Sequence, residues 1–202
     1  GKGERDIWVV EINNNGELVN EATFGGSLND RPMQIINSTN GYTIIGETFS
    51  NDGDVSFNHS GETDIWVLEI SADLVLLNEK TFGTTDNDNA TTILETEPGE
   101  FVLNGNFSGI RNWVAKIAWP SGEIVWENDL GYRNTLIGKL KKHNDFIYLV
   151  TNSKPSNGAG SALNWGYIAK LSQAGVLVDD FYFGGENLSL GPHFMDMAFD
   201  SS

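Results

Sequence analysis

The sequence lacks cysteine altogether and is poor in positive charge. Without cysteine, the 202 residues can form no disulfide, no thiolate metal site and no cysteine nucleophile. No apolar run approaches the roughly 18 residues that a membrane-spanning helix needs. Only 12 Lys and Arg stand against 28 Asp and Glu, a formal net charge of −16. So acidic a chain cannot neutralise a run of phosphates, which argues against nucleic acid and against an anionic membrane surface as partners.

Aromatic residues are plentiful, by contrast. The chain has 6 Trp, 11 Phe and 5 Tyr, and hydrophobic residues make up 39% of it. A disordered acidic tail would lack such residues, so we expect a folded chain that is long enough to bury a core.

A short apolar segment with an aromatic anchor recurs along the chain. Its four copies are DIWVVEI at 6–12, DIWVLEI at 64–70, RNWVAKI at 111–117 and GYIAKL at 166–171. The anchors Trp8, Trp66, Trp113 and Tyr167 are 58, 47 and 54 residues apart. A second landmark, Phe or Leu followed by Gly, recurs in step at 24–25, 82–83, 130–131 and 183–184. Two features that drift together indicate an internal repeat.

Each repeat alternates apolar and polar residues with a period of two, which predicts β-strands. Strands are expected at 7–13, 17–24, 32–38, 42–49, 65–71, 74–82, 89–95, 100–107, 135–142 and 145–152, and a further one at 193–199. Hairpin turns are expected at Asn40-Gly41, Pro98-Gly99 and Asn144-Asp145, because Asn, Asp and Gly tolerate the positive φ of tight turns. No segment has the apolar period of a helix.

The predicted fold is an all-β propeller of about four blades, each a four-stranded antiparallel sheet. One such sheet cannot bury both of its faces, whereas neighbouring sheets packed around an axis can. The whole chain, 1–202, would form one domain with an incomplete closing blade. The expected blades are 31–83, 84–131, 132–185 and a closing blade made from 6–30 together with 190–202.

The repeat unit also resembles a known kind of protein. The segments DIWVVEI, TFGGS and NGYTIIGETFSNDGDVS are similar to secreted propeller-like repeat proteins of Bacteroidetes-type bacteria. The match is close over 6–83, moderate over 84–131 and weaker beyond, and Glu11 and Glu69 stand where that family often has Lys. The resemblance implies an extracytoplasmic protein, either secreted or a cell-surface (outer-membrane) lipoprotein, with no established enzymatic role.

The loop after 42–49 is the best candidate metal site. It reads SNDGDVS at 50–56, and the hard oxygen donors Asp52, Asp54, Asn58 and Glu62 are of the kind that calcium accepts. The spacing is not that of an EF-hand, and the alternative is a connecting loop whose side chains cap their own backbone. Calcium is therefore the one candidate cofactor. The polar run at 86–89 has the same two interpretations, a calcium-binding loop or a solvated turn with local side-chain hydrogen bonds.

Three tryptophans outside the anchor positions are candidate ligand-binding residues: Trp119, Trp126 and Trp165. An exposed indole can stack on a sugar ring or anchor a protein partner. The alternative is packing against the adjacent blade, because tryptophan is highly buried on average.

No catalytic residue can be named from the sequence. His59, His143 and His193 fall in different repeats with no adjoining acid. The leading hypothesis is a monomeric, non-catalytic binding or scaffold module that engages a protein or glycan at the cell surface through loops at one face. One alternative is a polysaccharide-acting hydrolase or lyase with carboxylates in the axial funnel. Another is a spacer within a larger surface assembly.

Overall fold

The structure is a computed structural model that describes residues 1–59, 62–107, 111–130, 138–153, 165–183 and 196–200. These residues form 14 β-strands and no helix, which confirms the predicted all-β class. The described part of the chain accordingly contains no helix that could span a membrane.

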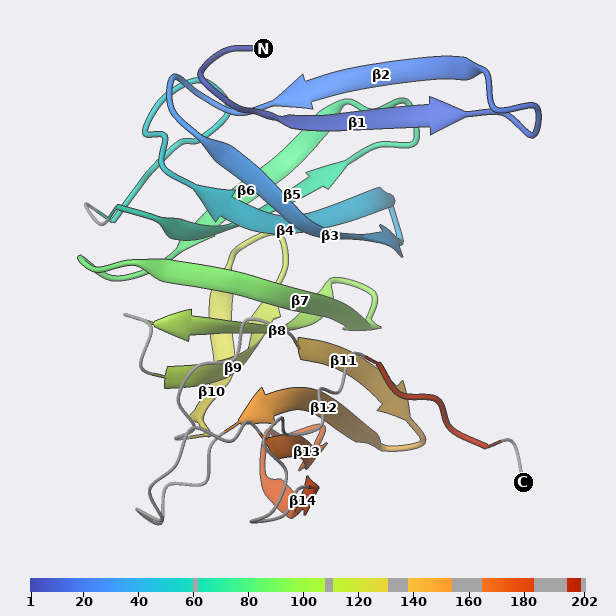
Figure 1. Cartoon of the computed structure of the whole chain (residues 1–202), viewed down its shortest axis with the longest axis vertical. Helices are drawn as coiled ribbons and strands as arrows, with labels where there is room; N and C mark the ends of the chain where they lie inside the picture. Colours follow the sequence, from blue (N-terminus) through green and yellow to red (C-terminus); the bar gives the residue numbers. More distant parts are fainter. Residues whose placement is uncertain (60–61, 108–110, 131–137, 154–164, 184–195, 201–202) are drawn as a thin grey trace. The chain divides into compact units, whose positions relative to one another are not determined.

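The strands form four antiparallel sheets, one of two strands and three of four strands (Figure 1). Within each sheet, strands that are consecutive in sequence are neighbours. The two-stranded sheet consists of β1 (Ile7–Ile12) and β2 (Leu18–Phe24). The others are β3 (Asp30–Ser38), β4 (Gly41–Thr48), β5 (Asp64–Ile70) and β6 (Leu76–Phe82); β7 (Asp88–Glu97), β8 (Glu100–Phe107), β9 (Arg111–Ala118) and β10 (Glu123–Asp129); and β11 (Gly138–His143), β12 (Phe146–Ser153), β13 (Trp165–Ser172) and β14 (Leu177–Phe183). The strands expected between 7 and 152 therefore form, with ends shifted by a few residues.

The tight turns arise where the sequence places residues that tolerate positive φ. Gly99 has a φ of 77° and Asn144 a φ of 52°, as expected for the turns after β7 and β11. The turn between β3 and β4 lies one residue earlier than predicted, because Gly41 already pairs with Ser38.

The chain divides into two compact units, residues 1–90 and 91–202. In the first unit, the β1–β2 sheet packs on the β3–β6 sheet (Figure 1). Ile7 and Phe24 from the smaller sheet share one buried cluster with Trp66, Leu68 and Ile70 of β5. The last three alternate along β5, as a strand with one face on a core requires.

The second unit repeats this packing. Val102 of β8 and Val114 of β9 share a buried cluster with Tyr167, Ala169 and Leu171, which alternate along β13. The face that carries the aromatic anchor therefore packs on the preceding sheet in both units.

The expected strand at 193–199 does not form in the residues described. Residues 193–195 lie outside them, and 196–200 carry no strand. Within the second unit, Phe199 stacks on His143 with ring centroids 4.2 Å apart, and Asp196 pairs with Lys141 at 3.0 Å. Both contacts are made with β11.

One turn has a leucine at a position with positive φ. Leu74, between β5 and β6, has a φ of 60°, whereas the equivalent turns have Gly16 and Gly175, each with a φ of 80°. Each of the three donates its N–H to a carbonyl three residues earlier. Leu74 tolerates this conformation because its side chain is buried in the core cluster of the first unit.

We predict that glycine at position 74 is less damaging than alanine. Leu74→Ala should lower the free energy of unfolding by about 3 kcal/mol, because it leaves a cavity. Leu74→Gly loses the same contacts but relieves about 1 kcal/mol of left-handed strain. Denaturant unfolding of both variants checks this. Leu68 in β5 is the control: there Leu68→Gly should lower the free energy of unfolding more than Leu68→Ala. A larger loss for Leu74→Gly than for Leu74→Ala would contradict the prediction.

Candidate functional site

Each tryptophan anchor is paired with a glutamate on the neighbouring strand. The indole Nε1 of Trp8 donates to Glu21, that of Trp66 to Glu79 and that of Trp113 to Glu127, at 2.9, 2.9 and 2.7 Å. In the antiparallel register Trp66 faces Thr81, so Glu79 is its diagonal neighbour on the same face. The glutamates recur in step with the anchors in the sequence, and that spacing is the signal from which they could have been predicted.

The same anchor meets different surroundings in the first sheet and in the others. Trp66 and Trp113 are buried, whereas Trp8 is 63% exposed. Val10 and Ile12, on the same face of β1, are 42% and 62% exposed. We call Trp8, Val10 and Ile12 the outer face of β1. It is a contiguous apolar stripe on a strongly acidic chain.

The two environments predict different costs for losing the glutamate. Glu79→Ala should lower the free energy of unfolding by about 1–3 kcal/mol, because it leaves the buried Trp66 N–H without its acceptor and also removes the acceptor of the Ser56 backbone N–H and hydroxyl. Glu21→Ala is the matched control and should change it by less than about 0.5 kcal/mol, because water replaces the acceptor at exposed Trp8. Chemical denaturation measures both. Equal losses at the two positions would contradict the prediction.

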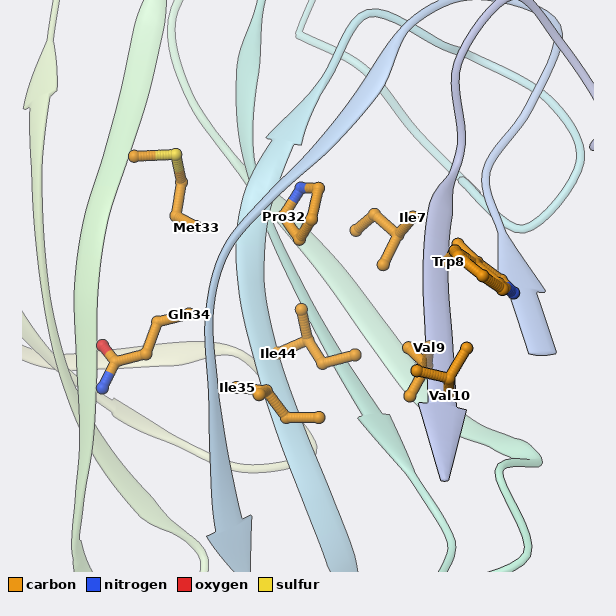
Figure 2. Close-up of a pocket in the computed structure, with 9 residues that line it drawn as sticks. All are labelled: Ile7, Trp8, Val9, Val10, Pro32, Met33, Gln34, Ile35 and Ile44. Carbon is orange, nitrogen blue, oxygen red and sulfur yellow. The ribbon is translucent and has the colours of Figure 1, made fainter. Parts of the chain in front are cut away.

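A hollow of about 320 Å³ lies between β1 and the β3–β4 pair. Figure 2 shows Ile7 and Val9 of β1 facing Ile35 of β3 and Ile44 of β4 across it. Pro32 also lies against this space, whereas the side chains of Met33 and Gln34 point away from β1 (Figure 2). All of the nine lining residues except Gln34 are apolar, which favours a hydrophobic side chain over an ion as the occupant of the hollow.

The predicted calcium ligands are engaged separately. Asp52 accepts a hydrogen bond from the Ser27 N–H at 2.6 Å, and Asp54 accepts one from the Gly25 N–H at 3.0 Å. Asp54 also forms an ion pair with Lys2. The backbone N–H of Asn58 donates to Asn51, and Glu62 accepts from the Asn87 side chain at 3.1 Å.

These contacts are those of loops that connect strands. Across the described residues, no group of three or more His, Asp or Glu side chains could hold a metal ion. A calcium site built from Asp52, Asp54, Asn58 and Glu62 stays a prediction.

Of the three predicted ligand-binding tryptophans, two have described side chains, and both pack against their own unit. Trp126 donates its Nε1 to the Gln173 carbonyl at 3.0 Å, and a Cβ at Gly175 would lie 2.5 Å from its ring. Trp119 is half-buried, with its ring edge-on to Phe101. The backbone of Trp165 begins β13, and its side chain lies outside the described residues.

Buried aspartates brace the turns that follow β2 and β6. Asp30 accepts from the Gly26 N–H at 2.8 Å and from Ser50 Oγ at 2.9 Å. Its equivalent, Asp88, accepts from the backbone N–H and the hydroxyl of Thr84. The run at 86–89 therefore makes the local hydrogen bonds expected of a turn, but Asp88 is fully buried rather than solvated.

One polar pair was missed in the sequence. His59 Nδ1 lies 2.9 Å from Asp64 Oδ2, so this histidine does have an adjoining acid. Asp64 also accepts the backbone N–H of His59 at 2.6 Å. His59 and Asp64 are five positions apart in the sequence, and the period-two alternation of the strands does not link them.

Among the described residues, the carboxyl groups of Glu47, Glu97 and Asp196 have displaced pKa values. Burial raises the pKa of Glu47, and Arg31, 3.9 Å away, opposes this in part. The pKa of Glu97 is lowered by its hydrogen bond from Lys142, and that of Asp196 by its hydrogen bond from Lys141. None of these groups lies in a cluster that suggests catalysis.

Glu47 gives a testable dependence of stability on pH. The pKa of Glu47 is higher in the folded state than in the unfolded state, where it is about 4.3. Its contribution to the free energy of unfolding is therefore fully present below the pKa of the unfolded state and is lost as the pH rises through the pKa of the folded state. Gln cannot titrate, so Glu47→Gln lacks this pH-dependent loss of stability. The free energy of unfolding of the variant, relative to that of the wild type, should therefore increase as the pH rises from about 4 to 7. Urea unfolding at several pH values measures the difference.

Glu97→Gln is the control for Glu47→Gln. The pKa of Glu97 is lowered on folding. Its contribution to the free energy of unfolding is therefore present above the pKa of the unfolded state and is lost as the pH falls through the pKa of the folded state. The free energy of unfolding of Glu97→Gln, relative to that of the wild type, should therefore decrease as the pH rises. A gain for Glu47→Gln that shrinks as the pH rises would contradict the assignment.

No protein-family model matches the chain, and no curated protein is significantly similar to it.

Proposed function

We propose that the protein is a non-catalytic binding or scaffold module that engages a partner protein through the outer face of β1. The observation that carries the proposal is the exposure of Trp8, Val10 and Ile12. A contiguous apolar patch on a soluble surface is typical of a protein-interaction site, and tryptophan is among the residues that dominate binding energy at such sites.

The repeat indicates the chemistry of the partner. Trp66, Leu68 and Ile70 are the equivalents of the outer face of β1, and they are buried with Ile7 and Phe24 of the preceding sheet. In the second unit, Tyr167, Ala169 and Leu171 are buried in the same way. This face is therefore shaped to pack on another apolar protein surface, which favours a protein over a glycan.

The hydrogen bonds of the buried aspartates support a binding function rather than a catalytic one. Asp30 and Asp88 accept hydrogen bonds from the turns that they brace, which is a structural role. An acid and a base of a glycosidase would instead need to face a substrate cleft.

The wider setting is part of the proposal. Four-stranded meanders that bury their anchor faces against the preceding sheet are consistent with blades of a propeller of about four sheets. The place outside the cytoplasm, as a secreted protein or surface lipoprotein, rests on the sequence resemblance alone.

An array of cell-surface proteins and glycans tests the function. The labelled full chain should bind a protein without turning over any polysaccharide. Trp8→Asp and Ile12→Asp should each weaken that binding by at least about tenfold, because a desolvated carboxylate costs more than 1.4 kcal/mol in an apolar interface.

Val75→Asp is the control for this experiment. Val75 is as exposed as Ile12, but it lies in the turn between β5 and β6. All three variants should unfold at the wild-type denaturant concentration. Binding of a glycan alone, turnover of a polysaccharide, or protein binding that survives both Trp8→Asp and Ile12→Asp would contradict the proposal.

A further inference from the structure

In the part of the chain that the structure describes, β1 has one edge without a paired strand, whereas its equivalents have a paired strand at both edges. β5, β9 and β13 each pair with a strand on both sides, whereas β1 pairs with β2 alone among the described residues. The edge opposite β2 therefore presents a row of backbone N–H and C=O groups that can pair with another strand.

The hollow lies beside this edge, and the second unit shows what fills the equivalent space. There β8 pairs with β9 and lies against β11. Val102 of β8 is fully buried in the cluster of the second unit, together with Leu140 of β11. The side chain of Asn104, two residues further along β8, closely approaches Gly138 of β11.

Ile35 and Leu140 occupy the same place in the two units. Ile35 pairs with Ile44, and Ile44 with Leu68. Leu140 pairs with Leu149, and Leu149 with Ala169, which is the equivalent of Leu68. Leu140 is only 5% exposed, whereas Ile35 is 49% exposed. The difference follows from the strand that covers Leu140 and that has no counterpart over Ile35 in the described part of the first unit.

We propose that the free edge of β1 accepts an extended segment of a partner protein as an added antiparallel strand. The segment resembles β8 in chemistry: it carries a β-branched or other aliphatic residue, the equivalent of Val102, which enters the hollow over Ile35 and Ile44. Backbone hydrogen bonds to β1 supply affinity, and the hollow selects the side chain. This inference rests on the proposed function, because it names the kind of segment that a protein partner contributes beside the outer face of β1.

A synthetic peptide of residues 100–107, which is the sequence of β8, is the probe. It should bind the full chain saturably below about 1 mM, as followed by titration calorimetry. In hydrogen exchange, the β1 amides on the edge opposite β2 should exchange fast in the unbound protein and become protected when the peptide is present.

Matched variants locate the binding. Ile35→Glu should weaken peptide binding by at least about tenfold, because it puts a charge in the apolar hollow. Leu77→Glu is the control on the protein, since Leu77 in β6 is similarly exposed and lies outside the hollow. A peptide with Val102→Asp should bind at least about tenfold more weakly as well, and a peptide N-methylated at alternate residues should not bind.

Several results would overturn the inference. The first is no saturable binding by the folded chain, and the second is binding that Ile35→Glu leaves unchanged. The third is protection, in the monomeric protein, of the β1 amides on the edge opposite β2, which would mean that the chain covers its own edge. A dimer in light scattering that Ile35→Glu dissociates would instead identify a second copy as the occupant. Ile12→Asp separates the two proposals, because Ile12 does not line the hollow. The variant should still bind the peptide, so weaker binding of a partner protein by this variant tests the proposed function alone.

Discussion

The structure depends on apolar packing between successive sheets. A four-stranded sheet with apolar residues on both faces is unstable in water until each face is covered, and in both units the anchor-bearing face is covered by the preceding sheet. Burial of Trp66 and Tyr167 in these contacts accounts for much of the core. The turns, the buried aspartates and the glutamate partners of the tryptophans all serve to hold these faces in register.

The Trp–Glu pairs show how a polar group is reconciled with this core. A buried indole N–H needs an acceptor, and a diagonal glutamate on the next strand supplies one without leaving the sheet face. The same pair persists at exposed Trp8, where burial does not demand it. The pair at Trp8 suits a face that another apolar surface covers, and this supports the proposed function.

Most of the fold could be predicted because its determinants are local. Alternation of apolar residues set the strands, and Gly99 and Asn144 marked their turns through backbone freedom. The site was less predictable. Trp126 looked like a ligand-binding residue in the sequence, and its contact with Gly175 depends on the packing of two sheets. The partnership of His59 with Asp64 depends on the path of a loop, which no periodicity records.

The sequence by itself determined the all-β class, the repeat and the identity of the faces, because side-chain alternation and turn chemistry act between near neighbours along the chain. Only the tertiary structure decided which of those faces are covered. Ile35 and Leu140 occupy equivalent places in their repeats, yet one is half exposed and the other buried. The reason is physical: burial belongs to the neighbouring sheet as much as to the residue, and β8 has no counterpart beside β1 among the described residues.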